Sequence, residues 1–312
     1  MQPLEMIRSE TDTSPVQGPF SLSDETAYQH WRQAKLVDYP AAAEALLVTI
    51  QDGRQLTAAE YQAIMQRLQK TNFVIYQFAD PAPVDKTVIH AMGRQFGLTH
   101  LDDNLCADED SISSLQVMPE GRKQGYIPYS NLRISWHTDG YYNDATHRIR
   151  AMLLHCVSDA ARGGENLLLD HEICYIHLRD TNPDYIRALM QPDAMGIPAN
   201  VEQGEELRAA MSGPVFSVDP ASGQLHMRYT ARTRSITWHD DALTREASQC
   251  IADYLASDSP YIFQHRLTPG QGLLCNNILH ARTAFEDDAA SGKSRLLYRA
   301  RYYDQLVDTR TR

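Results

Sequence analysis

What this sequence lacks disfavours several protein classes. None of its five cysteines lies in a CxxC pair, and their number is odd, so we expect reduced thiols rather than a disulfide framework or a zinc knuckle. No apolar run approaches the roughly 18 residues of a membrane-spanning helix. The first 17 residues do not combine a basic segment with a following apolar one, which is the pattern of a secretory signal. The sequence therefore predicts a cytoplasmic protein with no membrane partner.

Positive charge is scarce as well. Lysine and arginine total 29 against 40 aspartates and glutamates, and the formal net charge is -11. Sequence-independent binding to nucleic acid needs a basic surface, so a nucleic-acid partner is not expected. A local cluster of arginines can still attract a small anion in an acidic protein. We expect a small-molecule substrate, and nothing in the sequence indicates the oligomeric state.

The chain has neither an internal repeat nor a clear linker, which favours one domain. With 312 residues, 43% of them apolar, it can bury a large core. Residues 1–20 are rich in Ser, Thr, Pro and Glu and are expected to form a flexible arm. The remainder, 21–312, is expected to be a single domain with an N-terminal α/β cap (about 21–125) and a β-rich core (about 126–312). A lid is expected as an insertion in this core at about 171–260.

The predicted cap carries alternating helix and strand signals. Thr57 followed by Glu60 forms a capping-box pattern, and apolar residues recur with helical spacing over 61–68. The segment FVIYQF (73–78) is typical of a buried strand, and Pro83 is placed to open a second helix. The predicted order in this part is therefore helix, strand and helix.

Short strands dominate the rest of the sequence. They are separated by turn signals rich in Gly, Pro and Asp, and we predict them at 132–136, 149–156, 166–169, 215–218, 226–229, 261–267, 272–276 and 295–303. Helices are predicted between them at 171–179, 182–190, 204–211 and 244–256. Many short strands with intervening turns are typical of a barrel or sandwich. We predict an α+β, mainly β fold, namely a distorted jelly roll with flanking and inserted helices.

The segment SWHTDG (135–140) carries the sharpest chemical signal. Residues two apart in an extended strand face the same side, so His137 and Asp139 would present an imidazole nitrogen and a carboxylate oxygen to one metal ion. Two histidines and one carboxylate on one face of an octahedron are the ligand set of non-haem Fe(II) oxygenases, and they leave positions open for other ligands. His280 is the favoured third ligand, because it follows a predicted strand and a Pro-Gly turn.

Arginines follow in a strand-like pattern near the C-terminus. Arg295, Arg299 and Arg301 have the same parity, so they would face one side of the predicted strand 295–303. A planar guanidinium binds both oxygens of a carboxylate, and an anion inside a barrel needs such a partner. This strand therefore predicts an anion-binding face.

The residues alone leave two alternatives to an oxygenase open. A zinc or other metal-dependent hydrolase could use the same two histidines and aspartate. A non-catalytic barrel that binds a ligand would need no metal at all.

Several segments resemble the taurine dioxygenase (TauD/TfdA) superfamily, with similarity also to its γ-butyrobetaine hydroxylase and glutarate hydroxylase branches. In the order of the family, they are LTAAEYQAIMQRLQKTNFVIYQF (56–78), WHTDG (136–140), GGENLLLD (163–170), GPVFSVDPASGQLHMRYTARTRSI (213–236), NNILHARTAF (276–285) and RLLYRAR (295–301). Together they cover most of the chain from about residue 46. Several motifs in one order are far more specific than any one of them.

The resemblance implies a double-stranded β-helix core, which is a cupin-like jelly roll, and a 2-oxoglutarate-dependent dioxygenase. Such an enzyme uses Fe(II) and O2 to hydroxylate an unactivated C–H bond, and it releases succinate and CO2. Iron ligation and catalysis are implied at His137, Asp139 and His280. The expected substrate is a small polar, carboxylate-bearing metabolite or amino acid. Hydroxylation, desaturation and cyclisation share the same ligands and are not distinguished.

The resemblance also implies residues that hold the co-substrate. In the taurine-type pattern, Arg295 pairs with the far carboxylate of 2-oxoglutarate and Arg299 with an acidic group of the substrate. The glutarate-type pattern uses Arg299 and Arg301 instead. We favour Arg295 for the co-substrate, with Arg299 next. Asn166 stands where taurine-type members commonly have a Thr that helps hold 2-oxoglutarate, and its amide can still donate a hydrogen bond.

Contacts with the substrate are expected from five residues, for some of which a purely structural role is an open alternative. They are Arg299, Arg301, Arg133, Tyr142 and Arg232. Arg133 shares its parity with His137, Tyr142 follows the predicted iron motif, and Arg232 lies in the segment that resembles the substrate cap.

Overall fold

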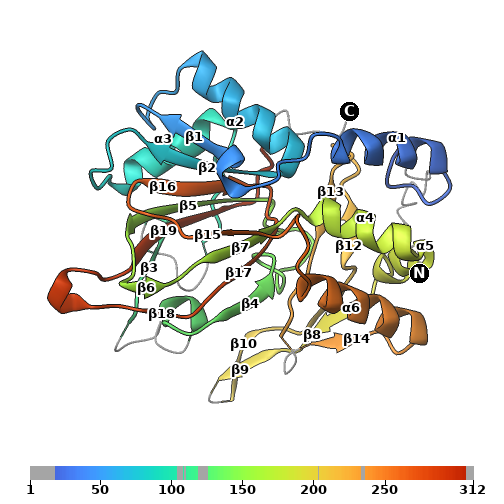
Figure 1. The fold of residues 1–312 in the computed structure, drawn as a ribbon. Coiled ribbons are helices and arrows are strands. Elements are labelled where there is room, and N and C mark those ends of the chain that lie inside the picture. The colour runs from blue at the N-terminus through green and yellow to red at the C-terminus, as the bar shows by residue number, and fades with distance from the viewer. Residues whose placement is uncertain are drawn as a thin grey trace, which may run out of the picture.

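Two facing β-sheets form the centre of the protein (Figure 1). The computed structural model describes residues 18–103, 108, 110–118, 126–202, 204–232 and 236–306. The larger sheet contains, in spatial order, β1 (Leu47–Ile50), β2 (Phe73–Phe78), β16 (Gln271–Cys275), β5 (Ala151–Ser158), β19 (Leu296–Tyr302) and β3 (Ser113–Leu115). The smaller sheet contains β15 (Phe263–His265), β7 (Asn166–Leu169), β17 (Leu279–Arg282) and β4 (Ile134–His137). All neighbours are antiparallel except β1 and β2, and the predicted jelly roll is confirmed.

Apolar side chains fill part of the space between the sheets. Leu168 of the smaller sheet lies in one buried cluster with Leu273 and Leu297 of the larger sheet. The helices α2 (Ala58–Thr71) and α3 (Lys86–Gln95) cover the outer face of the larger sheet (Figure 1). The larger sheet is therefore buried on both faces, which explains why its strands are apolar on both sides.

The capping signals of the first half of the chain are largely confirmed. Thr57 caps α2, and Glu60 returns the hydrogen bond to the backbone of Thr57, as the capping box predicted. The next helix, α3, begins at Lys86 rather than at Pro83. Asp85 is its N-cap, because its carboxylate accepts hydrogen bonds from two backbone N–H groups of the first turn.

A helical layer flanks one end of the sheets (Figure 1). It contains α1 (Glu25–Leu36), α4 (His171–Thr181), α5 (Pro183–Leu189) and α6 (Ala242–Leu255). The buried ammonium group of Lys35 on α1 forms ion pairs with Asp170, at 2.7 Å, and with Glu172. A buried charge costs free energy unless it is paired, so these contacts hold α1 against α4. None of the helices in the described ranges is long and apolar enough to cross a membrane.

Outside its helices, the predicted lid consists mostly of small sheets. They pair β8 (Met195–Ile197) with β11 (Met211–Gly213) and β14 (Thr237–Trp238), β9 (Asn200–Glu202) with β10 (Glu205–Arg208), and β12 (Phe216–Val218) with β13 (Leu225–Met227). Elsewhere, β6 (Arg162–Gly163) pairs with β18 (Phe285–Glu286), and short 3-10 turns occur at η1 (Ala43–Leu46), η3 (Ile127–Tyr129) and η4 (Ala289–Ser291).

The prediction of a helix at 204–211 is wrong. Glu205–Arg208 pairs antiparallel with Asn200–Glu202 as a hairpin, and another strand starts at Met211. Gly204 has a φ of +86°, a left-handed conformation that glycine adopts without strain. The helix-favouring Glu, Leu and Ala of this segment are overridden by strand pairing, which local propensity does not report.

The predicted boundary near residue 20 falls within packed structure, whereas the one near residue 125 lies outside the described ranges. Phe20 is buried, with its ring 4.9 Å from that of Trp31 and 5.4 Å from that of Tyr175. Residues 1–17 of the predicted arm lie outside the described ranges. The strands β1, β2 and β3 of the predicted cap pair within the larger sheet. Cap and core thus share one sheet, and the division of the chain stays a prediction.

Candidate active site

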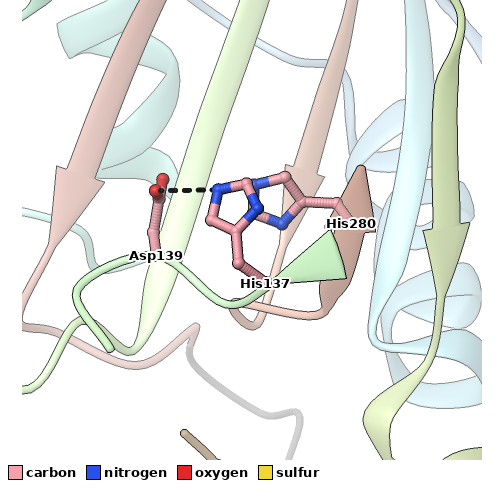
Figure 2. A group of neighbouring side chains, drawn as sticks. All are labelled: His137, Asp139 and His280. Carbon is pink, nitrogen blue, oxygen red and sulfur yellow. Dashed lines mark ion pairs between the residues drawn. The ribbon is translucent and has the colours of Figure 1, made fainter. Parts of the chain in front are cut away.

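His137, Asp139 and His280 lie together at one end of the space between the sheets (Figure 2). His137 ends β4, and His280 lies directly opposite it in β17. One potential ligand atom of each of the three residues lies within 4.8 Å of the others. The Nε2 atom of His137 is 3.8 Å from Oδ1 of Asp139. Pairing of β4 with β17 therefore brings the predicted HxD pair and the distant histidine to one point.

Both imidazoles are oriented through their Nδ1 atoms. Nδ1 of His137 lies 2.9 Å from the carbonyl oxygen of Ser135, and Nδ1 of His280 lies 3.0 Å from that of Ile278. A carbonyl oxygen only accepts, so each Nδ1 donates and the lone pair of each Nε2 stays available. Histidines that bind metals are held in this way.

The protonation states suit a divalent cation. Burial, and then the neighbouring His280, lower the pKa of His137 to about 3. Burial alone would raise the pKa of Asp139, but Arg299 and Arg301, together with the histidines, hold it well below its usual value. The Oδ2 atom of Asp139 is buried and has no hydrogen-bond partner among the described residues. A neutral imidazole, an ionised carboxylate and an unpartnered buried oxygen fit a metal ion at this point.

Asn277 holds the aspartate loop in place, and the sequence analysis did not single it out. Its Oδ1 accepts from the backbone N–H of Asp139 at 2.7 Å. Its Nδ2 donates to the carbonyl oxygens of Asp139, at 2.9 Å, and of Ile149, at 2.8 Å. Asn277 itself has a φ of +47°. Nothing local marks this Asn among others, because its partners lie more than a hundred residues away in the sequence.

Arg299 and Arg301 of β19 approach Asp139 from the larger sheet. Their Nη1 atoms lie 3.4 and 3.9 Å from Oδ1 of Asp139. Arg301 also forms an ion pair with the buried Asp102 and donates to the hydroxyl of Tyr142 at 3.0 Å. Arg299 has no hydrogen-bond or ion-pair partner other than Asp139 within the described ranges. Of the two, Arg299 is the one with donors free for another anion.

Arg295 and Arg282 are buried cations, and neither has a carboxylate within ion-pair distance in the described part of the chain. Their guanidinium carbons lie 5.0 and 4.8 Å from the ring centre of Phe285. Burial lowers the pKa of Arg295 to about 10, and burial with the charge of Arg295 lowers that of Arg282 to about 9. Two such cations cost free energy unless an anion joins them. No sequence signal singled out Arg282, although it lies two residues after His280 on the same strand.

A cavity of about 220 Å³, including the solvent at its mouth, lies beside Arg295 and Asn166. Asp159 in the same wall is already paired with Arg266, at 3.0 Å, and with Lys293, at 2.6 Å. The amide of Asn166 donates to the carbonyl of His265 at 3.3 Å. The cavity therefore offers the unpaired charge of Arg295 to an anion.

The Gly-Gly turn shapes this cavity. Gly163 and Gly164 have φ values of +71° and +80°. A Cβ on Gly163 would lie 2.2 Å from the carbonyl oxygen of Ala284, and one on Gly164 would lie 3.6 Å from Nε of Arg295. Only glycine allows the first of these approaches.

The cavity and the histidines lie along one face of β7 and β17. His280 is opposite Leu168, and Arg282 is opposite Asn166. Two residues of a strand span roughly 7 Å. The cavity wall at Asn166 is therefore two residues along the sheet from the position of His280.

The other predicted substrate residues differ in position. Tyr142 accepts from Arg301, whereas Arg232 is exposed and donates to the hydroxyl of Tyr141 at 3.3 Å. Arg133 is exposed. The β4–β17 register shifts so that Ile134 is opposite Arg282, and residues of β4 before the shift change sides. The parity argument for Arg133 is therefore wrong, and its contact with substrate stays a prediction without that support.

Residues 35–301 match the family described as taurine catabolism dioxygenase TauD, TfdA. The chain belongs to the TauD/TfdA family. It is thus a 2-oxoglutarate-dependent dioxygenase that requires Fe(II) and O2, which confirms the predicted enzyme class and cofactors. This TauD/TfdA membership disfavours the hydrolase and the non-catalytic barrel.

Named relatives of this TauD/TfdA chain are also dioxygenases. A uridine-5'-phosphate dioxygenase of Amycolatopsis sp is 30% identical over 257 residues, which are 75% of this chain and 87% of the relative. A trimethyllysine dioxygenase of Meyerozyma guilliermondii is 27% identical over 177 residues, which are 54% of this chain and 42% of the relative.

Solved structures confirm the fold of the TauD/TfdA family. An asparagine oxygenase in complex with Fe(II), 3-hydroxyasparagine and succinate has a TM-score of 0.56 at 14% identity, covering 82% of this chain and 93% of that one. The non-haem iron oxygenase OrfP, in complex with Fe and alpha-ketoglutaric acid, has a TM-score of 0.58 at 13% identity, covering 80% and 81%.

Proposed function

We propose that His137, Asp139 and His280 ligate Fe(II) through two Nε2 atoms and one carboxylate oxygen. The observation that carries this proposal is the buried, unpartnered Oδ2 of Asp139 beside two imidazoles whose Nδ1 atoms are already used. A cluster with this donor set and no acidic surplus suits an iron that keeps positions open for other ligands.

We propose that Arg295 binds the far carboxylate of 2-oxoglutarate, with Asn166 beside it. Arg295 is 6% exposed and has no ion-pair partner among the described residues, so a carboxylate would remove the cost of a lone buried cation. The amide nitrogen of Asn166 uses one N–H on His265 and has a second to donate. Arg299 lies beside Asp139 instead, at the metal end of the site.

The side chains around the metal position serve to place and shield the reactants. Fe(II), when bound, would supply the activation of O2, which is the oxidant: one oxygen atom enters the substrate C–H bond as C–OH, and the other enters succinate as 2-oxoglutarate loses CO2. Asn277 hydrogen-bonds to both the backbone N–H and the carbonyl oxygen of Asp139. These two bonds fix the backbone of Asp139 and, with it, the direction of the carboxylate. Arg299 and Arg301 keep that carboxylate ionised, and burial of the cluster limits access of water.

We propose a small polar substrate that carries a carboxylate, such as an amino acid. The support is Arg299, whose guanidinium has free donors next to the metal position. A bidentate contact of Arg299 with a substrate carboxylate would place a neighbouring C–H bond near the metal. Arg301 then acts through Tyr142, which it orients by a hydrogen bond.

A nucleoside 5'-phosphate is a second candidate substrate. The rings of Tyr141 and Tyr142 meet edge to face at 5.1 Å, and the guanidinium of Arg208 lies 5.7 Å from the centre of the Tyr142 ring. Aromatic faces stack on bases, and arginines bind phosphate. The relative from Amycolatopsis is named for uridine-5'-phosphate.

An anaerobic spectrum tests the metal and co-substrate assignment. We expect the metal-free protein to develop a visible charge-transfer absorption when Fe(II) and 2-oxoglutarate are added together, because a 2-oxo acid must chelate the iron to give it. His137→Ala and Asp139→Ala should abolish the band. His147→Ala, which changes an exposed histidine, is the matched control and should keep it. A wild-type protein that binds iron without the band would contradict the co-substrate assignment.

Succinate release over a panel of substrates separates the two substrate candidates. Each amino acid or nucleoside 5'-phosphate is added together with 2-oxoglutarate. The rate of succinate release is then compared with the rate measured without an added substrate. Stimulation by one class that is lost in Arg299→Gln supports that class, and stimulation by neither class rejects both.

We also propose a cytoplasmic location. The four cysteines in the described ranges are free thiols, and burial raises the pKa of Cys156 and Cys275 to about 12. Fractionation of the native cells would test this, and recovery outside the cytoplasm would refute it.

A further inference from the structure

A second cavity lies between the chain just before β5 and the β12–β13 hairpin. Its volume is about 290 Å³, including the solvent at its mouth. Its polar walls are formed by Arg148, Arg150, Asp219, His226, Asn276 and Gln305. The dioxygenase reaction gives none of these residues a task.

Asp219 compensates only one of the two arginines. Its Oδ1 accepts from the backbone N–H groups of Ala221, at 3.1 Å, and Ser222, at 2.9 Å, and also from the Ser222 hydroxyl. Its Oδ2 is paired with Arg150. The carboxylate is therefore fully engaged. It attracts the charge of Arg148 only from beyond ion-pair distance, so among the described residues Arg148 has no ion-pair partner.

Arg148 and His226 are half-buried and lack partners of their own. Neither the guanidinium of Arg148 nor the imidazole of His226 forms a hydrogen bond with any residue in the described ranges. Burial, and then Arg150, lower the pKa of Arg148. Burial, and then Arg148, hold the pKa of His226 well below its usual value. The cavity thus has one surplus positive charge and a neutral imidazole whose N–H can donate a hydrogen bond.

This cavity is separate from the metal position. None of the three proposed iron ligands is among the residues that line it. Arg228, two residues after His226, donates to the backbone carbonyls of Tyr141 and Gly213. The walls of the second cavity are therefore distinct from the proposed iron ligands.

We propose that the second cavity binds a phosphate group, either free phosphate or the phosphate of a small phosphorylated metabolite. Arg148 and Arg150 both line the cavity, so two guanidinium groups border the same space. With His226 they offer donors from three directions, which suits the several acceptor oxygens of a phosphate better than a planar carboxylate. A phosphate dianion also compensates the charge that Asp219 leaves over. This site does not depend on the proposed dioxygenase roles.

Calorimetric titration with inorganic phosphate tests the site on the full-length protein. We expect wild-type protein to bind phosphate, and Arg148→Gln to bind about tenfold more weakly or worse, because one charged hydrogen-bonding group is lost. Arg245→Gln removes the same charge from an exposed position on α6 and should bind like wild type.

Stability separates a binding role from a structural one. Arg148 makes no hydrogen bond and is repelled by Arg150, so Arg148→Gln should melt at the same temperature as wild type, or higher, in phosphate-free buffer. Added phosphate should then raise the melting temperature of wild type only. His226→Asn is a second variant, and it should weaken phosphate binding without unfolding the protein.

The outcomes are distinct. A phosphate monoester that binds more tightly than inorganic phosphate supports a phosphorylated metabolite, and the reverse order supports free phosphate. Equal binding of phosphate by wild type and Arg148→Gln overturns the proposal, as does a wild-type protein that binds acetate as well as it binds phosphate.

Discussion

Replacement of Arg295 by Gln should separate co-substrate binding from folding. The side chain is buried, it has no carboxylate partner among the described residues, and burial lowers its pKa to about 10 from 12.5. The desolvation cost of its charge in the metal-free protein is therefore on the order of 3 kcal/mol. Glutamine removes this cost, and loss of the contact with the Phe285 ring offsets about 1 kcal/mol of the gain. We expect an unchanged or higher melting temperature.

Binding of 2-oxoglutarate should change in the opposite direction. A bidentate contact between arginine and carboxylate contains two charged hydrogen bonds, each contributing about 1.5–3 kcal/mol. Since glutamine retains one neutral donor, we expect a loss of about 3–4 kcal/mol, which is roughly a 150- to 1000-fold weaker Kd.

Calorimetric titration of 2-oxoglutarate into protein loaded anaerobically with Fe(II) measures this loss. Arg266→Gln is the matched control, because Arg266 lines the same cavity but is already paired with Asp159. Binding by Arg295→Gln within a factor of about three of wild type would refute the assignment of Arg295. A strong drop in its melting temperature would refute the reasoning about the unpaired charge.

Three further predictions concern stability and support of the site. Lys35→Met removes the cation that pairs with two buried carboxylates. Urea titration should show a free energy of unfolding lower by about 3–5 kcal/mol. A loss smaller than that caused by removing an exposed ion pair would contradict this prediction. Burial lowers the pKa of His155 to about 4 from 6.5, so the unfolded state takes up a proton at a higher pH than the folded state. The free energy of unfolding should therefore fall by about 2 kcal/mol from pH 7 to pH 5. His155→Gln should show a shallower fall, and an equal slope in both proteins would refute the role of His155. Asn277→Ala removes three hydrogen bonds at the aspartate loop and should weaken metal binding about 10- to 100-fold. An unchanged metal affinity in a titration would show that the loop keeps its shape without Asn277.

Much of the secondary structure follows from local signals. The capping box at Thr57 and the apolar run at 73–78 appear as a capped helix and a buried strand. These signals are local because a cap satisfies hydrogen bonds within one turn, and a strand buried on both faces is apolar throughout. The segment 204–211 shows the limit, because its composition favours a helix while hairpin pairing makes it a strand.

The parity of side chains was a sound guide only where the strand pairing is regular. It correctly placed Arg299 and Arg301 on one face of β19, where both approach Asp139. It failed for Arg133, because the register of β4 shifts between Ile134 and His137, which separates Arg133 from the iron motif. A shift of this kind depends on the partner strand, which a single sequence does not reveal.

The sequence by itself determined the candidate ligands, the likeness to a family and the order of most elements. Those inferences rest on spacing and on motifs, which are properties of neighbouring residues. Only the tertiary structure decided which arginine keeps hydrogen-bond donors for another anion. Arg301 is engaged by the distant Asp102, whereas Arg299 contacts Asp139 alone among the described residues. It also revealed Arg282, Asn277 and the cavity at Arg148, because unpaired charge and long-range hydrogen bonds exist only once the chain has folded.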